Sequence, residues 1–277
     1  MIYGSAPYYL GRDRALTQLA NGQPFFVHTR DKGITPWIIL GGTWENFVDD
    51  ILCGVTRTGD RVLDAGANQG YYSVRLGRIV GPEGHIAAFE PNPEMIAVLE
   101  ANLSINDFTR RSTIYPFALA AEQGSSWLRV NADYAGSASL SPDIELPGEV
   151  EEIAVEAVRG DDALPPDAAF DVMKFDIEGF EPQAALGLAA VLARSAEAAI
   201  VVEITPHAWR GQGDFAEILA RFTGGYRVGF EICHDGMLER LNLSDAATLA
   251  GRADAFYALP LPHDHWAMDF ARSKLRA

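Results

Sequence analysis

Short apolar runs alternate with helical patterns from about residue 60 to the end of the chain. Seven runs predict strands, at residues 61–65, 85–89, 113–118, 171–175, 199–204, 227–233 and 256–259. Most of the segments between them repeat apolar residues every three or four positions, which is typical of helices that bury one face. The pattern therefore predicts an α/β fold with a doubly wound, mostly parallel, seven-stranded sheet and helices on both faces.

Two segments depart from this alternation. Residues 125–130 and 152–158 alternate like exposed strands around a Gly/Ser/Pro-rich stretch, 135–147, which predicts a hairpin insertion. Residues 1–57 are rich in aromatic residues and turn formers, and we expect them to form an N-terminal cap that contacts the substrate or a second subunit. Residues 58–277 then form the main domain.

Composition narrows the classes of partner. The chain has 22 Lys and Arg against 38 Asp and Glu, a net charge of −16. Nucleic acids and anionic membranes bind proteins largely through basic clusters, so we expect neither as a partner. Cys53 and Cys233 are too few for a disulfide framework, and the N-terminal residues lack a basic stretch followed by an apolar one. We expect a cytoplasmic protein.

The turn after the first predicted strand has the character of a ligand site. In open α/β sheets ligands bind beyond the carboxyl ends of the strands. Gly66 and Gly70 allow close approach of a ligand, and Asp64 adds a negative charge. A dinucleotide-binding turn would have a third glycine where Asn68 stands. The turn therefore suits a ligand with a cationic end better than one with a pyrophosphate.

Glu90, at the end of the second predicted strand, is placed to bind a ribose. It lies 24 residues beyond Gly66, about where an acidic side chain accepts the hydroxyls of a nucleoside. A ribose clamp and an acidic group without a phosphate cradle match S-adenosylmethionine. The expected cofactor-binding residues are Asp64, Gly66, Ala67, Asn68, Gly70, Tyr71, Ser73, Glu90, Pro91, Ala118 and Asp176.

Acidic residues follow the fourth and fifth predicted strands. Asp176 and Glu178 come after residues 171–175, and Glu203 and His207 stand at the end of 199–204 and just after it. We expect these four to form the catalytic group, with Asp176 as the base that takes a proton from an acceptor hydroxyl. A divalent cation held by these carboxylates is an alternative that we do not favour, because the sequence has no dedicated ligand spacing. No metal ligand is assigned.

Three stretches resemble the FkbM family of S-adenosylmethionine-dependent methyltransferases. They are Val62–Tyr72, Phe89–Pro93 and Lys174–Glu181, and the last, which reads Lys-x-Asp-x-Glu-Gly-x-Glu, is the most specific. Thr29–Asp31 and Gly42–Glu45 also resemble the N-terminal region of the family. The resemblance extends over residues 26–204 and implies a class I methyltransferase-like, Rossmann-like fold.

The family methylates hydroxyl groups of sugars, of polyketides and other secondary metabolites, and some peptides. The resemblance therefore implies an O-methyltransferase acting on a sugar, a glycan or a glycosylated metabolite. A polyketide or peptide natural product is the alternative acceptor. Two other classes stay open: a NAD-dependent oxidoreductase, which would need a phosphate-binding turn, and a non-catalytic cofactor-binding module, which would not need the carboxylates.

Overall fold

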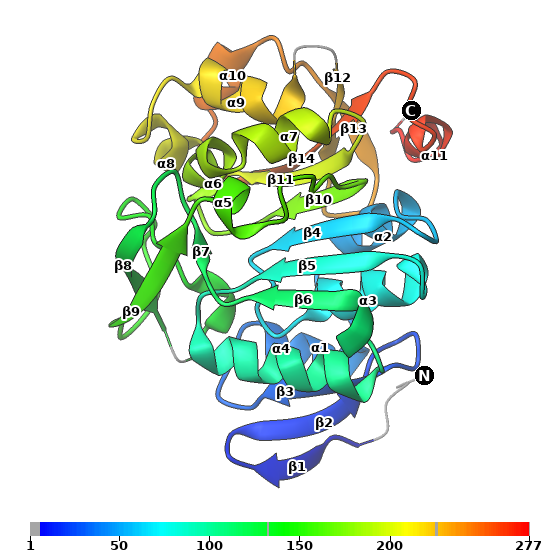
Figure 1. Cartoon of the computed structure of the whole chain (residues 1–277), viewed down its shortest axis with the longest axis vertical. Helices are drawn as coiled ribbons and strands as arrows, with labels where there is room; N and C mark the ends of the chain where they lie inside the picture. Colours follow the sequence, from blue (N-terminus) through cyan, green and yellow to red (C-terminus); the bar gives the residue numbers. More distant parts are fainter. Residues whose placement is uncertain (1–5, 132, 225–226, 277) are drawn as a thin grey trace.

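An eight-stranded sheet runs through the middle of the computed structural model, which describes residues 6–131, 133–224 and 227–276 (Figure 1). Its strands are β4 (Arg61–Ala65), β5 (His85–Phe89), β6 (Ser112–Tyr115), β10 (Val172–Phe175), β11 (Ala199–Ile204), β12 (Arg227–Ile232), β13 (Leu238–Leu241) and β14 (Phe256–Pro262). They are ordered β13-β12-β14-β11-β10-β4-β5-β6. From β11 to β6 the neighbours are parallel, whereas β14 is antiparallel to β11 and β12. This arrangement confirms the predicted fold class.

Helices cover both faces of the sheet because side chains alternate along each buried strand. Val62 packs into one core and its neighbour Leu63 into the other. The first core takes in α1 (Ile34–Gly41), α2 (Asn46–Gly54), α3 (Tyr71–Val80), α4 (Pro93–Ile105) and α11 (Met268–Ser273). The second takes in α5 (Gly160–Ala163), α6 (Glu181–Gly187), α7 (Ala189–Arg194), α8 (Pro206–Arg210), α9 (Phe215–Thr223) and α10 (Ala246–Ala250). In the described part of the chain, no helix is both long and apolar enough to cross a membrane.

The structure divides one predicted strand and adds another to the sheet. The run predicted at 113–118 is two strands, β6 and β7 (Ala118–Leu119), because Pro116 between them has no N–H group for a ladder. The seven predicted sheet strands are otherwise present, and β13 adds an eighth at the edge, antiparallel to β12. Helix α4 begins at Pro93, and the Asn92 side chain caps it by accepting the N–H of Glu94 at 3.0 Å.

The predicted hairpin insertion is present beside the carboxyl ends of the strands (Figure 1). Strands β8 (Gly124–Val130) and β9 (Glu151–Val158) pair antiparallel, and β7 joins them in a separate sheet ordered β7-β9-β8. The connection between β8 and β9 contains a short 3₁₀ turn, Ala135–Ser137, and a second one, Thr109–Arg111, precedes β6.

The N-terminal segment is described from residue 6 and packs on the same core as the sheet. Its strands β1 (Tyr8–Gly11), β2 (Arg14–Gln18) and β3 (Pro24–His28) form an antiparallel sheet in that order. The Asn102 side chain on α4 exchanges two hydrogen bonds with the backbone of Phe26 on β3, at 2.6 and 2.9 Å. The segment is therefore fixed to α4 through buried polar contacts as well as apolar ones.

Candidate active site

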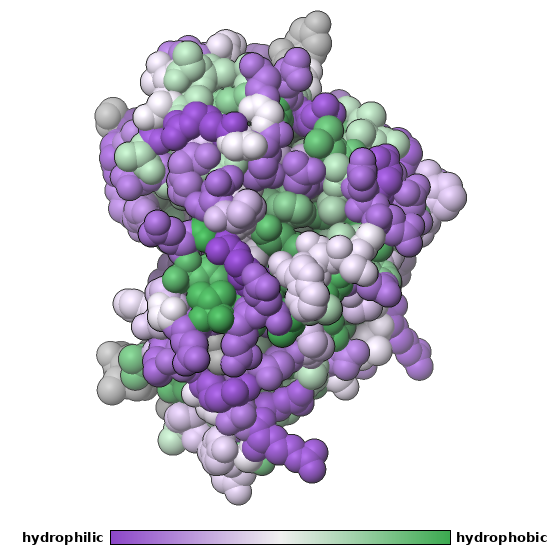
Figure 2. Space-filling view, turned by 90° about the vertical axis from the view of Figure 1, so that its left-hand side faces the viewer, coloured by the Kyte–Doolittle hydropathy of each residue, from purple (hydrophilic) through white to green (hydrophobic). Residues whose placement is uncertain are grey.

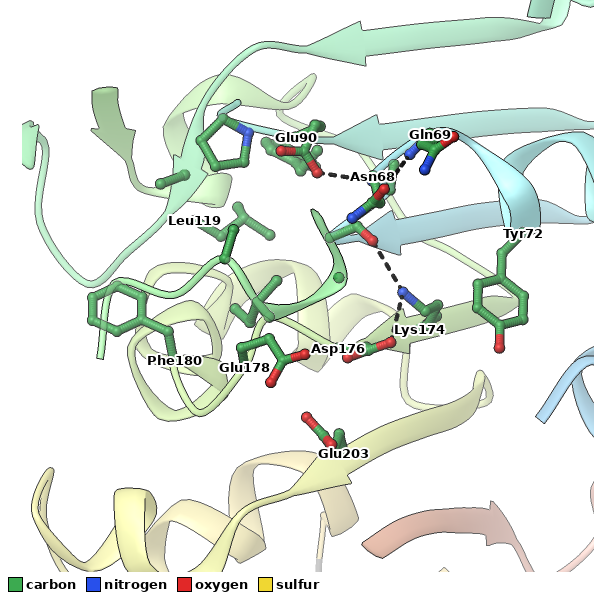
Figure 3. A pocket seen from close by; sticks show the side chains of 18 of the residues that line it. Asn68, Gln69, Tyr72, Glu90, Leu119, Lys174, Asp176, Glu178, Phe180 and Glu203 are labelled. Carbon is green, nitrogen blue, oxygen red and sulfur yellow. Dashed lines mark hydrogen bonds and ion pairs between the residues drawn. The ribbon is translucent and has the colours of Figure 1, made fainter. Parts of the chain in front are cut away.

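A pocket opens where the strand order reverses, at the carboxyl ends of β4, β5, β10 and β11 (Figure 3). Figure 2 looks onto the side of the molecule where these strand ends lie, and apolar residues reach the surface near its middle. The predicted site residues that line the pocket are Gly66, Ala67, Asn68, Tyr71, Glu90, Pro91, Ala118, Asp176, Glu178 and Glu203. The structure thus brings together residues from four strand ends and from the insertion.

The glycine turn permits the ends of β4 and β10 to come close together. Gly66 has a φ of +80°, and a Cβ built on it would lie 2.0 Å from the carbonyl oxygen of Asp176. Gly70 also has a positive φ, and a Cβ there would lie 2.6 Å from a methyl of Leu99. Both glycines are therefore required by packing, and only Gly66 also faces the pocket.

The same turn offers no cradle for a pyrophosphate. The five backbone N–H groups of residues 66–70 all have acceptors within the protein. The first two share one carbonyl, that of Phe89, at 3.0 Å each, and the third, of Asn68, donates to Glu90 at 2.8 Å. Because phosphate-binding turns work through free N–H groups, this geometry disfavours a dinucleotide.

Glu90 is held with both carboxylate oxygens directed at backbone groups. One oxygen accepts the N–H of Asn68 and the other that of Asn92, each at 2.8 Å. Each oxygen keeps a free lone pair, and the side chain lines the pocket. Burial raises the pKa of Glu90 to about 7, although both hydrogen bonds act to lower it. Glu90 thus has the geometry to accept hydrogen bonds from a vicinal diol.

Asp64 and Ser73 were predicted to bind the cofactor, and the structure places them elsewhere. Asp64 is fully buried behind the turn, where Ser73 donates to it at 2.6 Å and Lys174 forms an ion pair with it at 3.5 Å. Neither Asp64 nor Ser73 lines the pocket. The cause is the alternation of the strand, which directs Asp64 toward α3, opposite Lys174 in the register of β4 with β10.

Lys174 lies at the centre of a buried group of charges that includes Asp64 and Asp176. Its ammonium donates to the carbonyl of Gly66 at 3.1 Å and pairs with Asp176 at 3.3 Å as well as with Asp64. The neighbouring carboxylates hold the pKa of Lys174 above its usual range against the effect of burial. Lys174 therefore stays charged and links the glycine turn to the end of β10.

Three predicted catalytic carboxylates meet in the pocket. Figure 3 shows Asp176, Glu178 and Glu203 pointing toward one another from the ends of β10 and β11. Burial, followed by the charge of Asp176, raises the pKa of Glu178 and of Glu203 well above the usual value. One oxygen of Glu203 is buried without a hydrogen-bond partner among the described residues. A bound proton, or a hydrogen-bond donor or cation on a ligand, would reduce the repulsion among these carboxylates.

His207 does not join this cluster. It is exposed on the single-turn helix α8 and does not line the pocket. The chain turns from strand to helix at Thr205 and Pro206, and this change of direction carries the next side chain outward. The prediction that His207 faces the crevice is wrong.

Glu181, the last residue of the Lys174–Glu181 stretch, lies beneath the loop that follows β10. It is fully buried and accepts the N–H groups of Ile177 and Gly179 and the indole N–H of Trp209, at 2.9, 3.3 and 3.0 Å. These bonds fix the loop that carries Glu178, whose φ of +54° is unusual for a residue with a side chain. Glu181 is a support of the site.

Sequence reasoning missed several residues of the pocket. Glu45, which precedes α2, and Tyr257, on β14, both line it. The insertion and its surroundings add an apolar wall, which consists of Phe117, Leu119, Leu128, Ala138, Leu140 and Phe180. The sequence carried one signal, because Glu45 ends the Gly42–Glu45 stretch that resembles the family, whereas nothing marked Tyr257. Among the described residues, no group of three or more His, Cys, Asp and Glu side chains is arranged to hold a metal ion.

The buried carboxylates predict a loss of stability at alkaline pH. Burial raises the pKa of Glu45, Glu90 and Glu181 to about 7 from 4.5, so the folded chain binds more protons than the unfolded chain between these values. The free energy of unfolding should fall as pH rises through 7. Three histidines with lowered pKa values, His28, His85 and His265, act in the opposite direction, and their contribution fades as pH rises above their ordinary pKa of 6.5.

Urea midpoints measured between about pH 7 and about 8 test this expectation, since the carboxylates still titrate there while the contribution of the histidines fades. The Glu90→Gln variant is the control, and its midpoint should fall less steeply with pH because glutamine does not titrate. A wild-type midpoint that rises across this window would contradict the assignment.

Comparisons with known proteins bear on this site. Residues 64–232 match the sequence model described as the Methyltransferase FkbM domain. Methyltransferase sdnD of Sordaria araneosa is 31% identical over 118 residues, which are 42% of this chain and 43% of sdnD. Protein-L-isoaspartate O-methyltransferase of Ignicoccus hospitalis is 44% identical over 39 residues, 14% of this chain and 18% of that one. The matches thus span less than half the length of these relatives.

Solved structures show similarity at low identity. A putative rRNA-methylase from Clostridium thermocellum covers 78% of this chain and 94% of its own with a TM-score of 0.47 and 12% identity. Aeropyrum pernix fibrillarin, with S-adenosyl-L-methionine bound, covers 94% of this chain and all of its own with a TM-score of 0.41 and 13% identity.

Proposed function

The chain belongs to the FkbM family of methyltransferases, and from that premise we propose that it transfers the methyl group of S-adenosylmethionine to a hydroxyl oxygen of a small acceptor. The observation that carries the proposal is one pocket that joins Glu90, the glycine turn without free N–H groups, and a carboxylate cluster. Glu90 and the glycine turn suit a nucleoside without phosphates. The carboxylate cluster can supply the group that accepts a proton beside the transferred methyl group.

The transfer is an in-line displacement in which the acceptor oxygen forms a bond to the methyl carbon while the bond from carbon to sulfur breaks. The sulfonium loses its charge and the acceptor hydroxyl loses a proton. Asp176, Glu178 and Glu203 are the groups at hand to take that proton, and their negative charge also favours a cationic cofactor over its neutral-sulfur product. Positioning and exclusion of water supply the rest of the acceleration.

A sugar, glycan or glycosylated metabolite is the acceptor class that we put first. Trp44 and Phe180 line the pocket, and aromatic faces suit sugar rings. The apolar wall from the insertion favours a second class, a polyketide or peptide natural product whose hydroxyl is flanked by hydrocarbon. Nucleic acid is excluded from the proposal because a chain of net charge −16 repels a polyphosphate backbone.

The test is incubation with methyl-labelled S-adenosylmethionine and separate panels of glycosides, polyketide alcohols, peptides, RNA and DNA, with products identified by mass spectrometry. We expect labelled ethers from one of the first three panels and no label in RNA or DNA at physiological salt. The same assay after exhaustive chelation should give unchanged turnover, because proton removal by a carboxylate needs no cation. Strong labelling of RNA, or turnover that stops on chelation and returns with Mg²⁺, would contradict the respective part of the proposal.

A further inference from the structure

Glu45 brings a carboxylate into the pocket from outside the sheet-and-helix core. It stands just before α2 with a φ of +39°, and its side chain makes no capping hydrogen bond to that helix. An acidic side chain at a helix start can stabilise the helix by facing its N-terminal end. Here it lines the pocket instead.

Two tyrosines from distant elements hold this carboxylate in place. The hydroxyl of Tyr72 on α3 donates to one oxygen at 2.9 Å, and that of Tyr257 on β14 lies 3.3 Å from both oxygens. Both rings are buried. The position of Glu45 is therefore defined from two sides by neutral donors.

Glu45 forms no direct ion pair among the described residues, and Lys174 is the cation whose charge acts on it from a distance. Lys174, the buried cation of the pocket, pairs with Asp64 and Asp176. Burial and the nearby charge of Asp176 raise the pKa of Glu45 to about 7. A buried carboxylate that is hydrogen-bonded but unpaired gains most from a cation that arrives with a ligand.

The location of Glu45 matches one end of the proposed cofactor. Figure 3 shows Glu90 at one side of the pocket and Tyr72 at the other, with Lys174 and Asp176 between them. S-adenosylmethionine has its ribose and its amino-acid group on opposite sides of the sulfonium. With the ribose at Glu90 and the sulfonium near Asp176, the amino-acid end reaches the side where Tyr72 holds Glu45.

We propose that Glu45 forms the ion pair with the α-ammonium group of the cofactor, with Tyr72 and Tyr257 as the positioning residues. The proposal rests on the proposed function and deepens it. The N-terminal segment then takes part in binding the cofactor as well as in contacting the acceptor.

The experiment compares two ligands that differ at this end, S-adenosylhomocysteine and 5′-methylthioadenosine, which has no amino-acid group. In calorimetry, Glu45→Gln should weaken binding of S-adenosylhomocysteine by about 10- to 100-fold, as expected for a lost charge-assisted hydrogen bond. Its affinity for 5′-methylthioadenosine should stay within about twofold of wild type, because that ligand never reaches Glu45.

Two control variants sharpen the comparison. Glu94→Gln changes an exposed glutamate on α4 and should leave both affinities unchanged. Glu90→Gln should weaken both ligands, because both contain the ribose. If Glu45→Gln does not fold, Tyr257→Phe, which removes one of the two donors, must show the same selective loss in smaller measure.

Equal weakening of both ligands by Glu45→Gln, or unchanged affinity for S-adenosylhomocysteine, overturns the inference. So does a Tyr257→Phe variant without selectivity. A wild-type protein that binds neither ligand overturns the proposed function itself, which is a distinguishable result.

Discussion

Replacing Asp176 with asparagine is expected to lower kcat by at least about 100-fold while the affinity for S-adenosylhomocysteine stays within about threefold. Asp176 ends β10 in the pocket, where an asparagine would fill the same space without being able to accept a proton. Lys174 would keep Asp64 as its ionic partner, so the substitution leaves no buried charge alone. Single-turnover kinetics with an identified acceptor would measure the chemical step.

The matched control is Asp167→Asn, which changes an exposed aspartate away from the pocket and should leave kcat unchanged. Near-full activity of Asp176→Asn would mean that Asp176 is not the base. The role would then pass to Glu178 or Glu203, the two carboxylates that face Asp176 in Figure 3.

Gly66→Ala is expected to be the most disruptive small substitution at the site. A left-handed φ alone costs an L-residue about 1–2 kcal/mol. At Gly66 the added Cβ would also lie 2.0 Å from the backbone oxygen of Asp176, which cannot move without separating the ends of β4 and β10. We expect a total loss of more than about 3 kcal/mol in unfolding free energy, and no measurable binding of S-adenosylhomocysteine.

Comparison with Gly59→Ala separates the cost of the close approach at Gly66 from the cost of the left-handed φ. Gly59 has a similar φ of +90°, but nothing lies within 4 Å of a Cβ built there. Its alanine variant should lose only the conformational part of the stability and should bind the ligand normally. Equal destabilisation of the two variants in urea unfolding, with binding retained in both, would show that the close approach at Gly66 does not matter.

The sheet was readable from the sequence because its central strands are buried on both faces. Short, mostly apolar runs bounded by turn residues gave the limits of β4, β5 and β11. The edge strand β13 was not predicted because it has only four residues, Leu-Glu-Arg-Leu, whose two charged residues stand together and break any alternation. The single proline at 116 divided another strand without any change in hydropathy.

The site was predictable where it depends on strand ends and not where it depends on the direction of a side chain. The placement of Glu90 and Asp176 in the pocket follows from their positions at the ends of β5 and β10. Asp64 also lies at the end of β4, yet it points to the face opposite Leu63 and Ala65, toward α3, since one step along a strand reverses the side chain. Glu45 and Tyr257 are 212 positions apart, and only the folded chain shows that they meet.

This long-range contact has a consequence for the order in which the protein is completed in the cell. The N-terminal segment is synthesised before its partners, because Phe26 bonds to Asn102 and Glu45 bonds to Tyr257. Domains fold as units during synthesis, and contacts distant in sequence form late. The contacts of the N-terminal segment can therefore be completed only after β14 has been made. A nascent chain that stalls before β14 would present an open pocket and unpaired apolar side chains to chaperones and proteases.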